Sequence, residues 1–186
     1  MRRTPGHLAP DSLMARNIEI KARVASIYAL VPRVSAIADR GPVEIDQDDT
    51  FFLCATGRLK LRMLSEGSGE LIFYRRDDTL GPKESFYVRA ATNSPESLRE
   101  VLSLAYGLAG RVRKHRTLYQ CGRTRIHLDR IEGLGEFLEL EVVLQDGESA
   151  NAGVQEAERL LERLGITADQ LIPDAYVDLI VRGDGH

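Results

Sequence analysis

The stretch Asn17–Val24 has the sequence NIEIKARV, in which polar and apolar residues alternate without a break. A period of two is typical of a β-strand, because successive side chains of a strand point to opposite faces of the sheet. One face of this strand is aliphatic, and the other carries Asn17, Glu19, Lys21 and Arg23. An ordinary solvent-facing strand has the same pattern, so this strand alone does not indicate where its charged face points.

The same alternation returns along the chain, and each time one face of the strand is rich in charge. We expect further strands at residues 43–55, 58–63, 70–76, 83–90, 111–119, 125–129 and 137–143. Short turns separate most of them, which favours antiparallel pairing in one large sheet. Helices are expected at residues 26–38, 94–108, 148–164 and 175–180. The fold class is therefore α+β, with a sheet that tends to curl or close.

The charged faces of these strands hold many cations and few carboxylates. The cations are Lys21, Lys60, Arg62, Arg76, Lys114, Arg116 and Arg125, and the carboxylates are Glu19, Asp129, Glu139 and Glu141. If the sheet closes with these faces inward, the buried charge needs water and a charged ligand. A polyphosphate with a divalent metal ion matches the set, because cations bind phosphate oxygens and carboxylates bind Mg²⁺ or Mn²⁺.

An open sheet packed on helices, with all of these charges in solvent, would show the same alternation. Three of the expected helices carry apolar stripes and need a hydrophobic surface to pack on. Leu, Ile and Val dominate the uncharged strand faces, so helices covering those faces from outside would leave the charged faces lining the inside. The sequence therefore favours the inward arrangement.

The composition of the chain limits its function classes. The chain has 186 residues, 43% of them hydrophobic, which suits one domain with a sizeable core. The net charge of −3 gives no global basic field, so a nucleic-acid partner is not expected. Cys54 and Cys121 lack metal-ligand spacing and are expected as reduced thiols in the cytoplasm. Residues 1–14 lack the apolar stretch of a signal peptide or membrane span, and we expect a flexible tail before a single domain at 15–182.

The first strand also carries a resemblance, because NIEIKAR at residues 17–23 is similar to the Glu-x-Glu-x-Lys strand of the CYTH superfamily, the triphosphate tunnel metalloenzymes. Later motifs of that family are matched in order by GRLKLR at 57–62, LIFYRR at 71–76, VRKHR at 112–116, TRIHLD at 124–129 and FLELE at 137–141. The order and the compatible spacing make the resemblance specific, and it extends over residues 16–181. Within the superfamily the chain is most similar to the class IV adenylate cyclases.

The resemblance implies an eight-stranded antiparallel closed β-barrel that forms a triphosphate tunnel, with helices packed outside. It implies that Glu19, Glu139 and Glu141 bind Mg²⁺ or Mn²⁺. It also implies phosphate binding by Lys21, Lys60, Arg62, Arg76, Lys114, Arg116 and Arg125. The expected catalytic residues are Lys21, Lys114 and Asp129.

The activity that the resemblance implies is a metal-dependent, cytoplasmic reaction on a small-molecule triphosphate, with no nucleic-acid or membrane partner and with a homodimer left open. The first expectation is the conversion of ATP to cyclic AMP and pyrophosphate. One alternative is a triphosphate phosphohydrolase of the tripolyphosphatase or thiamine triphosphatase type. The other is a non-catalytic module that binds polyphosphate or nucleotide. Glu139 and Glu141 favour an enzyme over the binding module.

One residue departs from the family motif, because Asn17 stands where the first Glu is expected. Asparagine keeps an oxygen ligand but loses a charge, so we expect a weaker metal site. This departure is the feature that favours a binding module.

Overall fold

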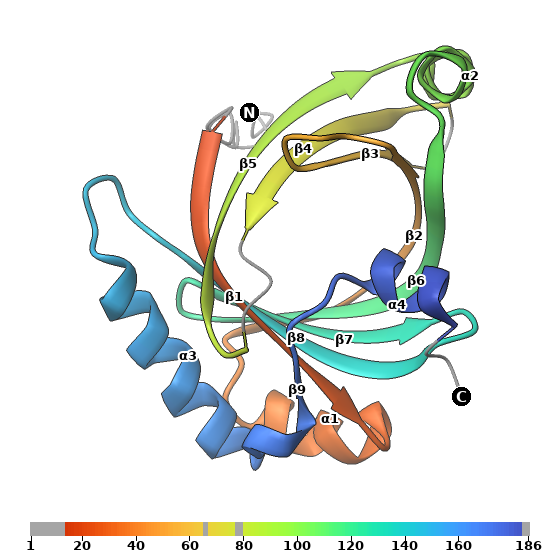
Figure 1. The fold of residues 1–186 in the computed structure, drawn as a ribbon. Helices are drawn as coiled ribbons and strands as arrows, with labels where there is room; N and C mark the ends of the chain where they lie inside the picture. Colours follow the sequence, from red (N-terminus) through yellow and green to blue (C-terminus); the bar gives the residue numbers. More distant parts are fainter. Residues whose placement is uncertain (1–13, 65–66, 77–79, 184–186) are drawn as a thin grey trace, which may run out of the picture.

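The computed structural model describes residues 14–64, 67–76 and 80–183. Eight antiparallel strands form a ring around a central space (Figure 1). They are β1 (Met14–Val24), β2 (Arg40–Phe52), β3 (Arg58–Met63), β4 (Gly69–Arg76), β5 (Lys83–Thr92), β6 (Leu108–Cys121), β7 (Thr124–Ile131) and β8 (Gly135–Val143). The expected α+β fold with an eight-stranded antiparallel sheet is thus confirmed.

The ring closes because the first half of β1 pairs with β5. The strand order is β5-β4-β3-β2-β6-β7-β8-β1, and the closing pairs run from Met14 opposite Val88 to Glu19 opposite Lys83. Beyond this point a short strand that the sequence did not predict, β9 (Leu171–Ile172), takes the place of β5 beside β1. The sheet is therefore a closed ring rather than a regular barrel.

Helices cover the outer, apolar faces of the strands. α1 (Ile27–Ser35) and α3 (Ala150–Leu164) pack over β1, β7 and β8 in the largest hydrophobic cluster. α2 (Pro95–Tyr106) covers β2 and β3, where Leu102 packs with Leu61. These contacts place the aliphatic faces outside the ring, so the alternation turns the charged faces inward, as expected.

The last helix departs from the expectation that all helices pack outside. α4 (Tyr176–Arg182) follows a 3₁₀ turn, η1 (Ala168–Gln170), and its Tyr176 lines the central cavity. The Tyr176 ring lies 5.0 Å from that of Phe137, within an apolar cluster between α4 and the inner faces of the strands. An ion pair of 2.7 Å between Arg58 and Asp178 fastens the helix to β3. α4 therefore caps the cavity instead of covering the ring.

The remaining expectations concern the chain ends and the cysteines. β1 begins at Met14, one residue before the expected start of the domain, and residues 1–13, where a flexible tail is expected, lie outside the described part. Cys54 and Cys121 are free thiols, as expected. In the described part of the chain, no helix is both long and apolar enough to span a membrane.

Candidate active site in the ring

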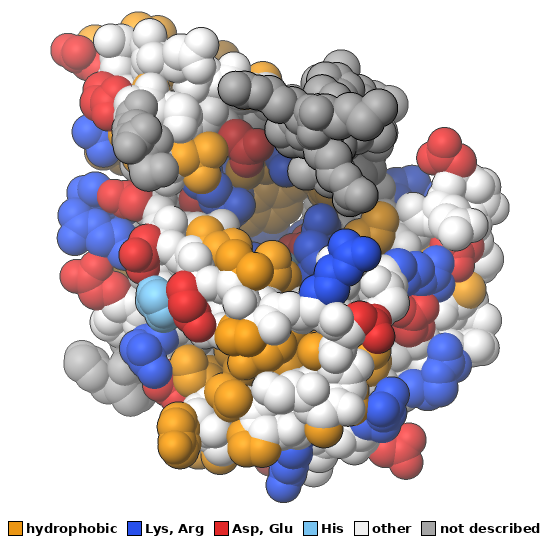
Figure 2. Space-filling view, turned by 180° about the vertical axis from the view of Figure 1, so that it is seen from behind, with side chains coloured by type: hydrophobic (Ala, Val, Ile, Leu, Met, Phe, Trp, Pro, Cys, Tyr) orange, Lys and Arg blue, Asp and Glu red, His pale blue; other side chains and the backbone are white. Residues whose placement is uncertain are grey.

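A cavity of about 260 Å³ lies inside the ring, and Figure 2 shows the hollow with charged side chains around it. Its basic lining residues are Lys21, Lys60, Arg62, Arg76, Arg89, Lys114, Arg116 and Arg125, and its acidic ones are Glu19, Asp49, Glu139 and Glu141. All seven cations expected to bind phosphate are among them, as are the three expected metal ligands. Eight basic against four acidic side chains leave an excess of four positive charges, which suits a polyanion.

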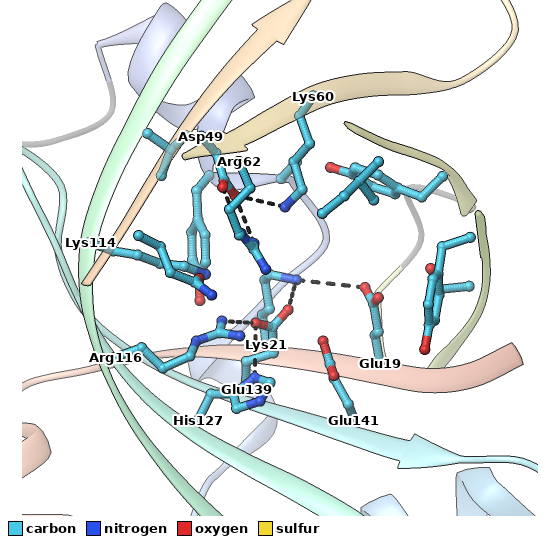
Figure 3. Close-up of a pocket in the computed structure, with 18 of the residues that line it drawn as sticks. Glu19, Lys21, Asp49, Lys60, Arg62, Lys114, Arg116, His127, Glu139 and Glu141 are labelled. Atoms are coloured by element: carbon cyan, nitrogen blue, oxygen red, sulfur yellow. Dashed lines mark hydrogen bonds and ion pairs between the residues drawn. The ribbon is translucent and has the colours of Figure 1, made fainter. Parts of the chain in front are cut away.

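Glu139 is the centre of the largest ion-pair network in the cavity (Figure 3). Its carboxylate contacts the ammonium of Lys21 and accepts a hydrogen bond of 2.5 Å from Nη2 of Arg116. Nδ1 of His127 lies 3.4 Å from the same oxygen of Glu139. Burial opposes ionisation, but Lys21 and Arg116 outweigh it and hold the pKa of Glu139 well below its usual range. Glu139 is therefore an anion surrounded by cations.

Asp129 lies behind this network and does not line the cavity. It is fully buried, accepts hydrogen bonds of 2.6 Å from both Nε and Nη2 of Arg116, and lies 3.2 Å from Nζ of Lys114. Burial opposes its charge, but these two cations hold the pKa of Asp129 below its usual range. The expected catalytic role of Asp129 stays a prediction, and this geometry favours an orienting role.

Lys114 and Lys21 both lie over the ring of Tyr176, with their ammonium nitrogens 5.2 and 5.3 Å from its centroid. Burial, and next the charge of Arg116, lower the pKa of Lys114 to about 8, although Asp129 raises it. The charge of Lys114 is therefore sensitive to pH in the mildly alkaline range.

His127 and two of the acidic side chains, Glu139 and Glu141, form a group that fits a divalent metal ion, whereas the expected ligand Glu19 lies outside this group and pairs with Arg76 at 3.1 Å. Glu19 and Glu141 are register partners on β1 and β8, and one ligand atom each from His127, Glu139 and Glu141 lie within 4.8 Å of one another. Carboxylate oxygens are the ligands that Mg²⁺ and Mn²⁺ prefer. Arg125 holds Glu141 at 2.8 Å, so a metal ion would compete with this cation for the carboxylate.

Asn17 lines the cavity two residues before Glu19 and is 1% exposed. Its Oδ1 is buried and meets no hydrogen-bond donor among the described residues, and the same is true of Oγ of Ser85, its register partner on β5. The side chain thus presents a neutral oxygen beside the acidic group, at the position where the motif has a carboxylate.

Several residues that line the cavity were not assigned a role from the sequence, among them Asp49, Arg89, His127 and Tyr176. Asp49 and His127 have the inward parity of their strands, a signal that could have indicated both. Tyr176 arrives on α4, whose position depends on contacts distant in sequence, so no local signal indicates it.

The remaining lining is mixed. Ile45, Ile72 and Leu118 supply apolar surface, and Tyr74 and Tyr87 are register partners on β4 and β5. Such a surface suits a planar organic group beside the phosphate-binding cations.

Comparisons with known proteins agree with this geometry. The CYTH domain matches residues 15–176, and the chain therefore belongs to the CYTH family. Among curated relatives, the protein "Putative adenylate cyclase MJ0240" of Methanocaldococcus jannaschii is 31% identical over 171 residues, 87% of this chain and 97% of the relative. Adenylate cyclase CyaB of Aeromonas hydrophila is 24% identical over 166 residues, 86% of this chain and 85% of the relative.

Solved structures show the same fold. The PH1012 protein of Pyrococcus horikoshii OT3 superimposes with a TM-score of 0.78 at 22% identity, covering 88% of this chain and 98% of the other. HpAC1 of Hippeastrum, whose structure is described as revealing a dominant triphosphatase activity, has a TM-score of 0.64 at 16% identity and covers 91% and 96%. At these identities the likeness extends to the fold alone.

Proposed function

We propose that the protein is a metal-dependent enzyme that binds a nucleoside triphosphate in the ring and converts ATP to cyclic AMP and pyrophosphate. The observation that carries the proposal is the inward cluster of eight cations, with the group of His127, Glu139 and Glu141 among them. The cations match the charge of a triphosphate, and the mixed apolar and aromatic lining suits a base. The two curated relatives named as adenylate cyclases support the choice of reaction.

In the proposed reaction the ribose 3′ hydroxyl attacks the α-phosphorus and releases its proton to water. A bond forms between that oxygen and phosphorus, the bond from phosphorus to the bridging oxygen breaks, and pyrophosphate leaves with the electron pair. Lys21 and Lys114 are the proposed catalytic cations, which stabilise the charge that develops on the phosphoryl and leaving oxygens. Two nitrogens of the Arg116 guanidinium bind Asp129, and this contact orients Arg116 to stabilise the same developing charge.

The residues that would hold Mg²⁺ or Mn²⁺ are Glu19, Glu139 and Glu141. When bound, such an ion supplies Lewis-acid polarisation of phosphoryl oxygens. Lys21 and Arg125 pair with Glu139 and Glu141 in this structure, and in the proposed site both cations would also bind phosphate.

Hydrolysis of the terminal phosphate is the second candidate, favoured by the fold shared with HpAC1. Both reactions need the same cation cluster and differ in the nucleophile. Incubation with ATP, tripolyphosphate or thiamine triphosphate, each with Mg²⁺ or Mn²⁺, separates them. We expect equal amounts of cyclic AMP and pyrophosphate from ATP. Release of orthophosphate alone would replace the cyclase by a hydrolase, and binding without any product would leave a binding module.

The low pKa of Lys114 predicts a pH dependence of triphosphate binding. Below pH 8 the side chain is charged, and as the pH rises through about 8 it loses its proton, so affinity for tripolyphosphate should fall. Calorimetric titrations between pH 7 and 9 measure this change. Lys114→Arg stays charged over the whole range and should flatten the decline, whereas an equal decline in this variant would assign the effect to another group.

Asn17 predicts a weak metal site that can be strengthened. Asn17→Glu adds a carboxylate beside Glu19, and we expect it to lower the Mg²⁺ concentration that gives half-maximal activity. A titration of rate against Mg²⁺ for both proteins measures the shift. Unchanged or poorer use of Mg²⁺ would mean that Asn17 lies outside the metal shell or that the new charge is repelled by Glu19.

A further inference from the structure

Asp49 is a carboxylate of the cavity that the proposed reaction does not use. It lies on β2, opposite Arg62 of β3 in register, and is 2% exposed. Figure 3 shows it with Lys60 and Arg62 on one side of the cavity, apart from Glu139 and Glu141. It is not part of the group formed by His127, Glu139 and Glu141, whose ligand atoms lie within 4.8 Å of one another, so its role must differ from metal binding in that group.

Asp49 accepts hydrogen bonds from only some of the donor groups of Arg62 and Lys60. Oδ1 accepts from Nε of Arg62 at 2.8 Å, and Oδ2 accepts from Nη2 of Arg62 at 2.9 Å and from Nζ of Lys60 at 2.8 Å. Among the described residues none accepts a hydrogen bond from Nη1 of Arg62. Because a guanidinium is a rigid fork, a carboxylate on one edge fixes the direction of the other edge.

The charge of Asp49 also favours the ionised form of Lys60, because it raises the pKa of this side chain. Burial lowers the pKa of Lys60, the charges of Arg62 and Arg116 lower it further, and Asp49 opposes them. The groups that face the Lys60 ammonium are Asp49 and Phe51 of β2, Arg62 of its own strand, Tyr74 of β4 and, at longer range, Arg116 of β6. Of these, Asp49 is the one that is negatively charged, so its loss would favour the neutral amine.

We propose that Asp49 is a positioning residue of the triphosphate site, which orients Arg62 and Lys60 so that their remaining donors meet phosphate oxygens. The inference rests on the proposed function. Asp49 and phosphate use different donors and bind together. The alternative is that Asp49 competes with phosphate for the same donors and has to leave them when phosphate binds.

Calorimetric titration with inorganic tripolyphosphate, without added metal, tests the proposal. We expect Asp49→Asn to weaken binding about tenfold, because Arg62 loses its orientation and Lys60 loses the anion that favours its charged form. Titrations at pH 8 in two buffers of different ionisation enthalpy should show extra proton uptake on binding for this variant. Asp49→Glu, which keeps the charge, should recover most of the affinity.

Asp48→Asn is the matched control, because Asp48 is the preceding residue of β2 and pairs with Arg111 on the outer face. It should bind tripolyphosphate as the parent does. Equal or tighter binding by Asp49→Asn would overturn the proposal and make Asp49 a competing anion. If the parent itself binds no tripolyphosphate, the proposed function fails first, and the inference falls with it.

A second measurement needs no change at Asp49 and holds even if Asp49→Asn does not fold. The Nε–H signal of Arg62 in a ¹⁵N NMR spectrum, identified by its loss in Arg62→Lys, reports on the bond to Asp49. We expect this signal to stay protected from solvent exchange when tripolyphosphate binds. Loss of protection on binding would show that phosphate displaces Asp49.

Discussion

Glu139→Gln is expected to lower the rate of product formation on the order of 100-fold, because the change keeps the shape of the side chain but removes its charge. Glu139 contributes to the acidic group that fits a metal ion and binds Lys21 and Arg116. A neutral amide is a poorer ligand for a hard dication. The rate should therefore also need more Mg²⁺ or Mn²⁺ for half-saturation.

Stability must be separated from catalysis in this experiment. Removing one partner of a buried ion pair leaves the other uncompensated and destabilises a fold by roughly 3–5 kcal/mol. Rates are therefore compared well below the unfolding temperature of the variant. Glu132→Gln, at a side chain 67% exposed near Arg113, is the control and should leave the rate unchanged. A Glu139→Gln protein that is folded and keeps the metal dependence and rate of the parent would remove Glu139 from the site.

Arg116→Lys should lower kcat/KM for the triphosphate by about 100-fold although the charge is conserved. The guanidinium binds Asp129 through two nitrogens and Glu139 through one of them, and a single ammonium cannot reproduce this geometry. We expect the loss in both KM and kcat, because in the proposed function Arg116 binds phosphate before and during the reaction. Steady-state kinetics with varied triphosphate measure both constants.

Arg113→Lys is the matched control for Arg116, because it lies on the same strand with a side chain 50% exposed on the outer face. Little change is expected there. If Arg116→Lys were as active as Arg113→Lys, point charge alone would be enough at this position, and the argument from guanidinium geometry would be wrong.

The sequence predicted the cation cluster well, because period-two alternation is a geometric property of every strand. In β3, the expected bounds 58–63 and the inward direction of Lys60 and Arg62 are those of the structure. The apolar stripes of the helices indicated which face of each strand must lie outside, because those stripes need an apolar surface to pack on.

The acidic part of the site was harder to predict. β2 carries acidic residues on both faces, with Asp46 and Asp48 outside and Asp49 inside, so its composition did not single out one face. Asp129 has the expected inward parity, but Arg116 and Lys114 lie between it and the cavity, and only side-chain packing decides this.

The capping of the cavity could not be predicted at all from local patterns. β9 has two residues, and α4 is held by contacts of the Arg58–Asp178 kind between residues far apart in sequence. Tyr176 under the two lysines follows from that docking.

A crystal structure of the protein with tripolyphosphate and Mn²⁺ tests the central claim, that the ring binds a triphosphate with a metal ion. We predict phosphate density inside the cavity, within hydrogen-bond distance of Arg62, Lys114 and Arg116. We predict the anomalous signal of Mn²⁺ beside Glu139 and Glu141. Tripolyphosphate found only on the outer surface, with the ion pairs of the cavity unchanged, would contradict the account.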